Sequence, residues 1–206
     1  CLVSILPGMA QTEKLTDYVN PFVGTDGYGN VYPGAQIPFG GIQISPDTDS
    51  RFYDAASGYK YNHLTLMGFS LTHLSGTGIP DLGDFLFIPG TGEMKLEPGT
   101  HEDPDQGYRS RYSHDKEWAS PNYYAVELAD YGVKAEMTSG VRSGMFRFTY
   151  PESDNAFIMI DMNHTLWQSC EWSNLRMIND STITGYKLVK GWGPERHVYF
   201  TATFSK

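Results

Sequence analysis

The sequence alternates between apolar and polar residues most clearly over residues 124–150. Three runs follow one another there: Tyr124-Ala125-Val126-Glu127-Leu128, Val133-Lys134-Ala135-Glu136-Met137-Thr138 and Met145-Phe146-Arg147-Phe148-Thr149-Tyr150. Because successive side chains of a strand point to opposite faces of a sheet, each run predicts a strand with one buried face. Turn residues separate the runs, as at Asp130-Tyr131-Gly132. Strands that recur about every ten residues predict an all-β fold, an antiparallel β-sandwich.

Further strands are expected on both sides of this region. Phe157-Ile158-Met159-Ile160 is an apolar run that predicts a buried central strand. Convincing helical periodicity, an internal repeat and a linker are all missing, so we predict one domain over residues 11–206. The other expected strands are Ile42–Ser45 with a turn at Pro46-Asp47, Leu64–Phe69, Phe85–Ile88, Thr182–Leu188 and a terminal run from Val198.

Composition narrows the functional classes. Of the 206 residues, 40% are hydrophobic, enough to fill a core, and 14% are aromatic, which suits a sandwich and suits contact with sugars. The net charge of −9 argues against nucleic-acid binding, because phosphates are neutralised by basic patches. No apolar run reaches the length of a membrane span.

Both ends of the sequence look cut. Cys1–Ala10 resembles the end of a signal peptide with cleavage before Gln11, which predicts export to the periplasm or the extracellular space. A lipoprotein cysteine at Cys1 fits less well, because a polar linker normally follows such a residue. Removal of the leader would leave Cys170 without a disulfide partner. The strand pattern of Val198–Lys206 runs to the last residue, so we expect the chain to be the front piece of a longer protein.

Two polar, glycine-rich stretches interrupt the strand pattern. One is His73-Leu74-Ser75-Gly76-Thr77-Gly78, which closes with Asp81-Leu82-Gly83-Asp84, and the other is Gly24-Thr25-Asp26-Gly27-Tyr28-Gly29-Asn30. Small residues allow close approach of the backbone to another group, and glycine also permits positive φ. The polar groups could hold a hydroxyl-rich ligand or simply cap turns. The two stretches indicate that loops carry much of the function.

No catalytic motif stands out within these loops. Ser75 lacks the Gly-x-Ser-x-Gly elbow of a hydrolase, and His63 and His73 lack the spacing of zinc ligands. Glycoside hydrolysis needs two carboxylates across the scissile bond, and Asp54, Asp81 and Asp84 are candidates by residue type only.

The acidic segment from Glu93 to Asp105 lacks the regular spacing of a calcium loop and favours a solvated loop. Tyr59, Tyr61 and Trp192 lie beside glycine or polar residues, where an aromatic ring can be exposed to a sugar. For Trp192, which is flanked by Gly191 and Gly193, an exposed position and a core position remain open alternatives.

Taken in order, these segments resemble the opening of glycoside hydrolase family 92. The resemblance covers nearly all of Leu15–Lys206, and the ordered set is specific although any one motif is weak. The sequence departs from the family's usual pattern around Asp54 and at Ile79. The matching segments are Tyr18–Thr25, Tyr32–Ala35, Ile37–Gly40, Ser45–Thr48, Ser57–Tyr59, Gly68–Ser70, His73–Gly78, Gly83-Asp84, Gly191-Trp192 and Val198–Phe200.

The resemblance implies a calcium-dependent, inverting exo-α-mannosidase acting on mannose-containing glycans. In that family an N-terminal β-sandwich packs on an (α/α)6 barrel, which supplies the catalytic carboxylates and the calcium ligands. This chain would be the sandwich, with no catalytic residue and no metal ligand of its own, and the barrel of the same chain would be its partner.

Six residues are expected on the sugar-facing or interdomain surface: Tyr59, His73, Ser75, Gly76 and Trp192, which match family motifs, and the neighbouring Gly193. Two other readings stay open. The chain could be a stand-alone carbohydrate-binding module, or a sandwich that supports the barrel without touching sugar. The polar, glycine-rich loops argue mildly against the last, because a dry packing face would be more apolar.

Overall fold

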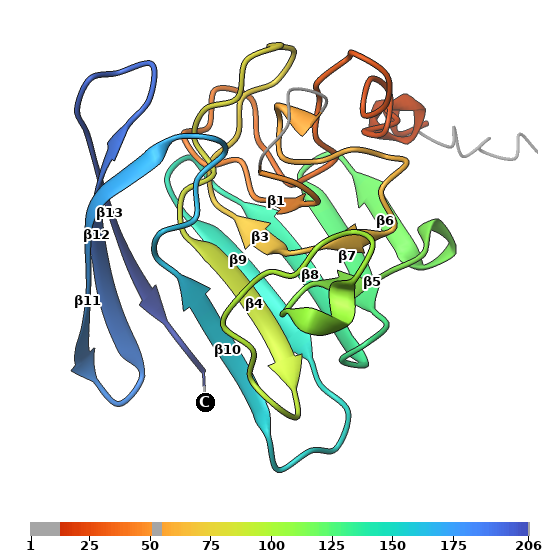
Figure 1. Ribbon diagram of the computed structural model, residues 1–206. Helices are drawn as coiled ribbons and strands as arrows, with labels where there is room; N and C mark the ends of the chain where they lie inside the picture. The colour runs from red at the N-terminus through yellow and green to blue at the C-terminus, as the bar shows by residue number, and fades with distance from the viewer. Residues whose placement is uncertain (1–12, 51–54, 206) are drawn as a thin grey trace, which may run out of the picture.

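The computed structural model describes residues 13–50 and 55–205, which form thirteen strands and three short 3-10 helices (Figure 1). The fold is all-β, as predicted. The leader expected at residues 1–10 and the candidate Asp54 lie outside the described residues. Among the described residues, no helix combines the length and apolar character that a membrane crossing requires.

The region that alternates most clearly forms one antiparallel sheet in the order β6-β7-β8-β9. Its strands are β6 (Glu117–Ser120), β7 (Tyr123–Leu128), β8 (Val133–Ser139) and β9 (Gly144–Thr149). In β8 every second side chain is buried, from Val133 to Ser139. The strands predicted from the alternation are therefore confirmed.

A second antiparallel sheet has the order β1-β3-β4-β10. It consists of β1 (Ser45–Asp47), β3 (Gly68–Ser70), β4 (Leu86–Thr91) and β10 (Ala156–Asp161). The turn expected at Pro46-Asp47 is wrong, because both residues belong to β1. Since β1 pairs only with β3 among the described strands, the missing N–H of Pro46 costs no ladder hydrogen bond. The central position expected for Phe157–Ile160 is also wrong, because among the strands that the structure describes β10 pairs with β4 alone, and it is half-buried.

The third sheet has the order β11-β12-β13 and stands beside the other two (Figure 1). Its strands are β11 (Ser169–Asn179), β12 (Thr182–Lys190) and β13 (Arg196–Thr203). β13 ends at Thr203, before the end of the run from which it was predicted. The smaller elements are η1 (Leu15–Tyr18), β2 (Thr65–Leu66), η3 (Pro104–Gln106), β5 (Ser110–Arg111) and η4 (His114–Lys116), with β2 paired to β5.

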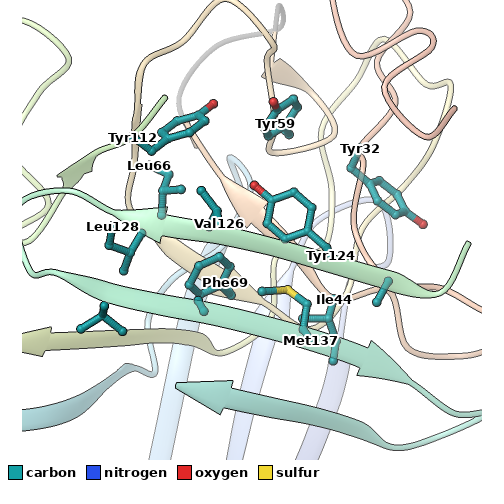
Figure 2. Close-up of a cluster of buried hydrophobic side chains, with 13 residues drawn as sticks. Tyr32, Ile44, Tyr59, Leu66, Phe69, Tyr112, Tyr124, Val126, Leu128 and Met137 are labelled. Carbon is teal, nitrogen blue, oxygen red and sulfur yellow. The ribbon is translucent and has the colours of Figure 1, made fainter. Parts of the chain in front are cut away.

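The main core lies between the first two sheets (Figure 2). Phe69 of β3 is fully buried, and its ring centroid lies 6.5 Å from that of Phe146 and 6.4 Å from that of Phe148, both on β9. The third sheet attaches through Phe200 of β13, whose ring lies 4.5 Å from Phe85 and 5.9 Å from Phe87. The buried members of the core are Tyr32, Ala35, Ile44, Tyr59, Leu66, Phe69, Tyr112, Tyr124, Val126, Leu128, Val133, Ala135 and Met137.

We predict that Phe69→Ala lowers the free energy of unfolding by about 3–5 kcal/mol, because it removes a buried ring and leaves a cavity between two sheets. Phe39 is a matched control, since its side chain is fully exposed at 102%. Phe39→Ala should change the unfolding free energy by about 0.5 kcal/mol or less. Urea unfolding of both variants checks this, and equal effects would contradict the assignment of the core.

Candidate functional site

Asp47 lies at the centre of a buried polar cluster beneath the loops. Its Oδ1 is 2.7 Å from Nε2 of His73, and its Oδ2 is 2.7 Å from Nε2 of His164. All three residues are buried. The cluster therefore joins β1 to the loop at residue 73 and to the loop after β10, which lies 117 residues further along the chain than Asp47.

The contacts of His73 define its charge. Its Nδ1 lies 2.6 Å from the carbonyl oxygen of Gln43, and its Nε2 faces Asp47 and the hydroxyl of Ser70. A carbonyl oxygen and an ionised carboxylate only accept hydrogen bonds, so both ring nitrogens of His73 donate. A protonated ring in this position would neutralise the Asp47 carboxylate.

Burial by itself would raise the pKa of Asp47, but the two histidines outweigh it and hold the pKa well below its usual range.

The position beside this carboxylate has room only for a glycine, Gly58. Its φ is +86°, and a Cβ at this position would lie 2.1 Å from Oδ1 of Asp47. The Ser57-Gly58-Tyr59 motif thus makes room for the buried charge.

A second buried carboxylate belongs to Asp84. Its Oδ1 lies 3.1 Å from Nζ of Lys187 on β12, and its Oδ2 accepts a hydrogen bond of 2.5 Å from Nη1 of Arg196 on β13. Burial opposes ionisation, but Lys187, Arg196 and a hydrogen bond from Thr72 lower the pKa of Asp84. Burial lowers the pKa of Lys187, although Asp84 acts in the opposite direction. Lys187 also donates to the carbonyl oxygen of His164 at 2.5 Å, which joins the two clusters.

The turn that carries Trp192 is held by Asp81. The Asp81 Oδ2 accepts the backbone N–H of Trp192 at 3.0 Å, and a Cβ at Gly191 would lie 2.9 Å from Oδ1 of Asp81 and 2.6 Å from Cγ of Gln168. Gln168 in turn donates to the carbonyl oxygen of Pro80 at 2.7 Å. These contacts bring residues 80–81, 168 and 191–192 together.

The structure divides the six predicted site residues into two groups. Four of them, Ser75, Gly76, Trp192 and Gly193, are exposed. Since 59% of the surface of Trp192 is accessible, the structure selects the exposed alternative for this residue over the core alternative. His73 is buried, and its ring contacts Asp47 and the backbone of Gln43. Its side chain therefore points into the fold and away from the exposed loop surface. Sugar contact by any of the six stays a prediction.

The exposed ring expected for Tyr59 is wrong. Tyr59 is only 1% exposed, and its hydroxyl donates to the buried carboxylate of Glu117 at 3.0 Å. Tyr124 donates to the same carboxylate at 2.5 Å, and Nδ1 of His114 lies 2.6 Å from it. Burial raises the pKa of Tyr59 far above its usual range, so the phenol stays protonated. The ring packs in the core, and the hydroxyl is a hydrogen-bond donor to Glu117.

These carboxylates are poorly suited to proton transfer. Asp47 pairs with two histidines and Asp84 with Lys187 and Arg196, and these contacts favour the ionised form of both carboxylates. Among residues 13–50 and 55–205, no group of three or more His, Cys, Asp or Glu side chains is placed to hold a metal ion. The acidic side chains predicted to form a solvated loop, Glu93, Glu97, Glu102, Asp103 and Asp105, are exposed.

Sequence reasoning missed the loop between β10 and β11. Leu166 is fully buried, and its N–H donates to the carbonyl oxygen of Leu82 at 3.0 Å. Gly83 has a φ of +74°, and a Cβ there would lie 2.6 Å from Cγ of Leu166. The next residue, Trp167, is exposed and has a φ of +74°. Neither His164 nor Trp167 belongs to a recognisable motif, so only the tertiary contacts reveal them.

Comparisons with known proteins agree with this architecture. The family model of the glycosyl hydrolase family 92 N-terminal domain matches residues 18–206. The solved structure of the GH92 family glycosyl hydrolase ccman5 is similar with a TM-score of 0.73 and 29% sequence identity, over 90% of this chain and 26% of that one. The matches place the chain among the glycoside hydrolases. It belongs to family 92 of this class, as its N-terminal domain.

Two further relatives support the assignment. An uncharacterized secreted glycosidase of Arthroderma benhamiae is 30% identical over 139 residues, which are 66% of this chain and 17% of that protein. The family GH92 inverting mannosidase BT2199 of Bacteroides thetaiotaomicron has the same fold, with a TM-score of 0.66 and 21% identity over 93% of this chain and 29% of that one. The chain therefore spans less than a third of the length of each relative.

We predict that Asp47→Asn lowers the free energy of unfolding at pH 7 by about 3–5 kcal/mol, because it breaks the buried pairs of Asp47 with His73 and His164. In the wild type, the pKa of Asp47 is lower than its value of about 3.9 in an unfolded chain. The carboxylate therefore stabilises the fold above about pH 4, and this stabilisation is lost as the pH falls. Urea unfolding between pH 3 and pH 7 should show a flatter acid limb in the variant. Asp115→Asn, at an exposed site, is the control and should follow the wild type.

Proposed function

We propose that this chain is the substrate-shaping N-terminal domain of an exported, calcium-dependent, inverting exo-α-mannosidase that acts on the α-mannosides of glycans. The observation that carries the proposal is the family 92 match over residues 18–206. The inverting mannosidase of Bacteroides thetaiotaomicron shares the fold, and the relative in Arthroderma benhamiae is named as secreted.

The division of labour has a physical basis. Exo cleavage requires a pocket that admits one end of a sugar chain, and a second domain can narrow an open barrel mouth and exclude water. The exposed residues Ser75, Gly76 and Trp192 suit such a wall, because a buried carboxylate contact anchors the loop at residue 73 and Asp81 holds the turn of Trp192. The buried Asp47 and Asp84 are committed to that framework, so we assign the catalytic carboxylates and the calcium ligands to the C-terminal barrel of the parent chain.

We predict that residues 11–206, purified alone, release no mannose from α-mannobiosides, whereas the full-length parent protein does. Mannose release measured with a coupled enzymatic assay provides the test. Turnover by the fragment would contradict the division of labour. Glycan binding by the fragment with no hydrolysis by the full-length protein would favour the alternative, a carbohydrate-binding module.

We also predict that EGTA abolishes mannose release by the full-length protein and that CaCl2 restores it. The expected loss is at least tenfold, because we assign the calcium ligands to the same barrel as the catalytic carboxylates. MgCl2 at the same concentration is the control and should restore little activity, since Mg²⁺ requires a smaller and more rigid oxygen shell. Full activity after exhaustive chelation would contradict the calcium requirement.

A further inference from the structure

A hollow of about 530 Å³ lies beside the framework, between the loop after β10 and the segment that contains Pro98 and Tyr108. Asp161, Asn163, Trp167, Met67 and Tyr108 are among the residues that line it. Its volume falls within the range of small-molecule sites. None of the six residues expected to face sugar lines this hollow.

The side chains of the hollow combine an aromatic surface with polar groups. Trp167 has 55% of its surface exposed. Asp161 is half-buried. Within the described residues, its Oδ2 accepts one hydrogen bond, a long one of 3.3 Å from the Tyr108 hydroxyl. The amide oxygen of Asn163 accepts from Ser173 at 3.1 Å, which leaves its amide nitrogen as the group to donate to a ligand. A pyranose ring offers matching chemistry, namely an apolar C–H face and a rim of hydroxyl groups.

The backbone fixes this arrangement in place. Trp167 has a φ of +74°, a region that is unfavourable for a residue with a Cβ. It is held there by the buried Leu166 on one side and by a hydrogen bond of 2.8 Å from Oγ1 of Thr165 to the carbonyl oxygen of Gln168 on the other. The Oδ1 of Asp161 accepts the N–H groups of Asn163 at 2.8 Å and of His164 at 3.1 Å. Strained residues that the surrounding structure holds firmly tend to cluster at binding sites.

We propose that this hollow binds one pyranose ring of a neutral hexose glycan. The Trp167 indole stacks on the C–H face of the sugar, Asp161 accepts from its hydroxyl groups, and Asn163 donates to them. The choice of mannose as the hexose rests on the proposed function, whereas the stacking site itself rests on the residues that line the hollow.

The test uses the full-length protein and isothermal titration with a thio-linked α-mannobioside, which is not hydrolysed. Trp167→Ala should weaken binding at least tenfold, and Trp167→Phe should recover most of the affinity because it keeps an aromatic face. Asn163→Ala should weaken binding severalfold. Trp172→Ala is the matched control, since Trp172 on β11 is 54% exposed and does not line the hollow, and it should bind as the wild type does. Thermal unfolding of each variant verifies that it is folded.

The outcomes separate this inference from the proposed function. Wild-type affinity in Trp167→Ala, with mannoside binding and hydrolysis intact, would overturn the inference and leave the proposed function standing. If the full-length protein neither binds nor cleaves mannosides, the proposed function fails, and methyl α-glucoside and methyl α-galactoside become the probes. Binding of either that is lost in Trp167→Ala supports the hollow as a hexose site, and no binding of any of these neutral hexosides overturns it.

Discussion

The ion pairs of the buried Asp47 carboxylate are the constraint on which the loops depend. A carboxylate in a protein interior is costly unless it is paired and hydrogen-bonded, and here both oxygens lie 2.7 Å from an imidazole nitrogen. Because His73 and His164 come from distant parts of the chain, the charge is satisfied only when β1 and both loops are in place. An apolar replacement of similar volume could be as stable, but it would not define the positions of three loop backbones in the same way.

Asp84 repeats this arrangement for the third sheet. Its two cations come from neighbouring strands, β12 and β13, and Lys187 also reaches the carbonyl oxygen of His164. The two clusters therefore form one connected network beneath the exposed loops. Asp81 ties Trp192 to this network, since it lies 3.8 Å from Arg196, and Trp167 follows three residues after His164, so the network positions these two exposed indoles.

The sequence predicts those parts of the fold that depend on local pattern. Strict alternation identified β7, β8 and β12 within a few residues. It missed β11, the longest strand, because register shifts between Cys170 and Trp172 and between Met177 and Asn179 break the period of two. It placed β10 centrally because an apolar run cannot report which strands lie beside it. Tyr59 was misjudged for a related reason, since its neighbours are polar and glycine but its partner Glu117 lies 58 residues away.

The polar motif from His73 to Asp84 shows why the candidate site was only partly predictable. Read as a string, its histidine, serine, glycines and aspartates all suit contact with sugar. In the fold, His73 and Asp84 point to buried charges, while Ser75 and Gly76 remain exposed. The charged members of the motif therefore position the loop, and the small members define its surface. This separation follows from burial energetics, because a charge is retained in the interior only with a partner, and the partners of these charges lie in strands and loops that no local pattern connects to the motif.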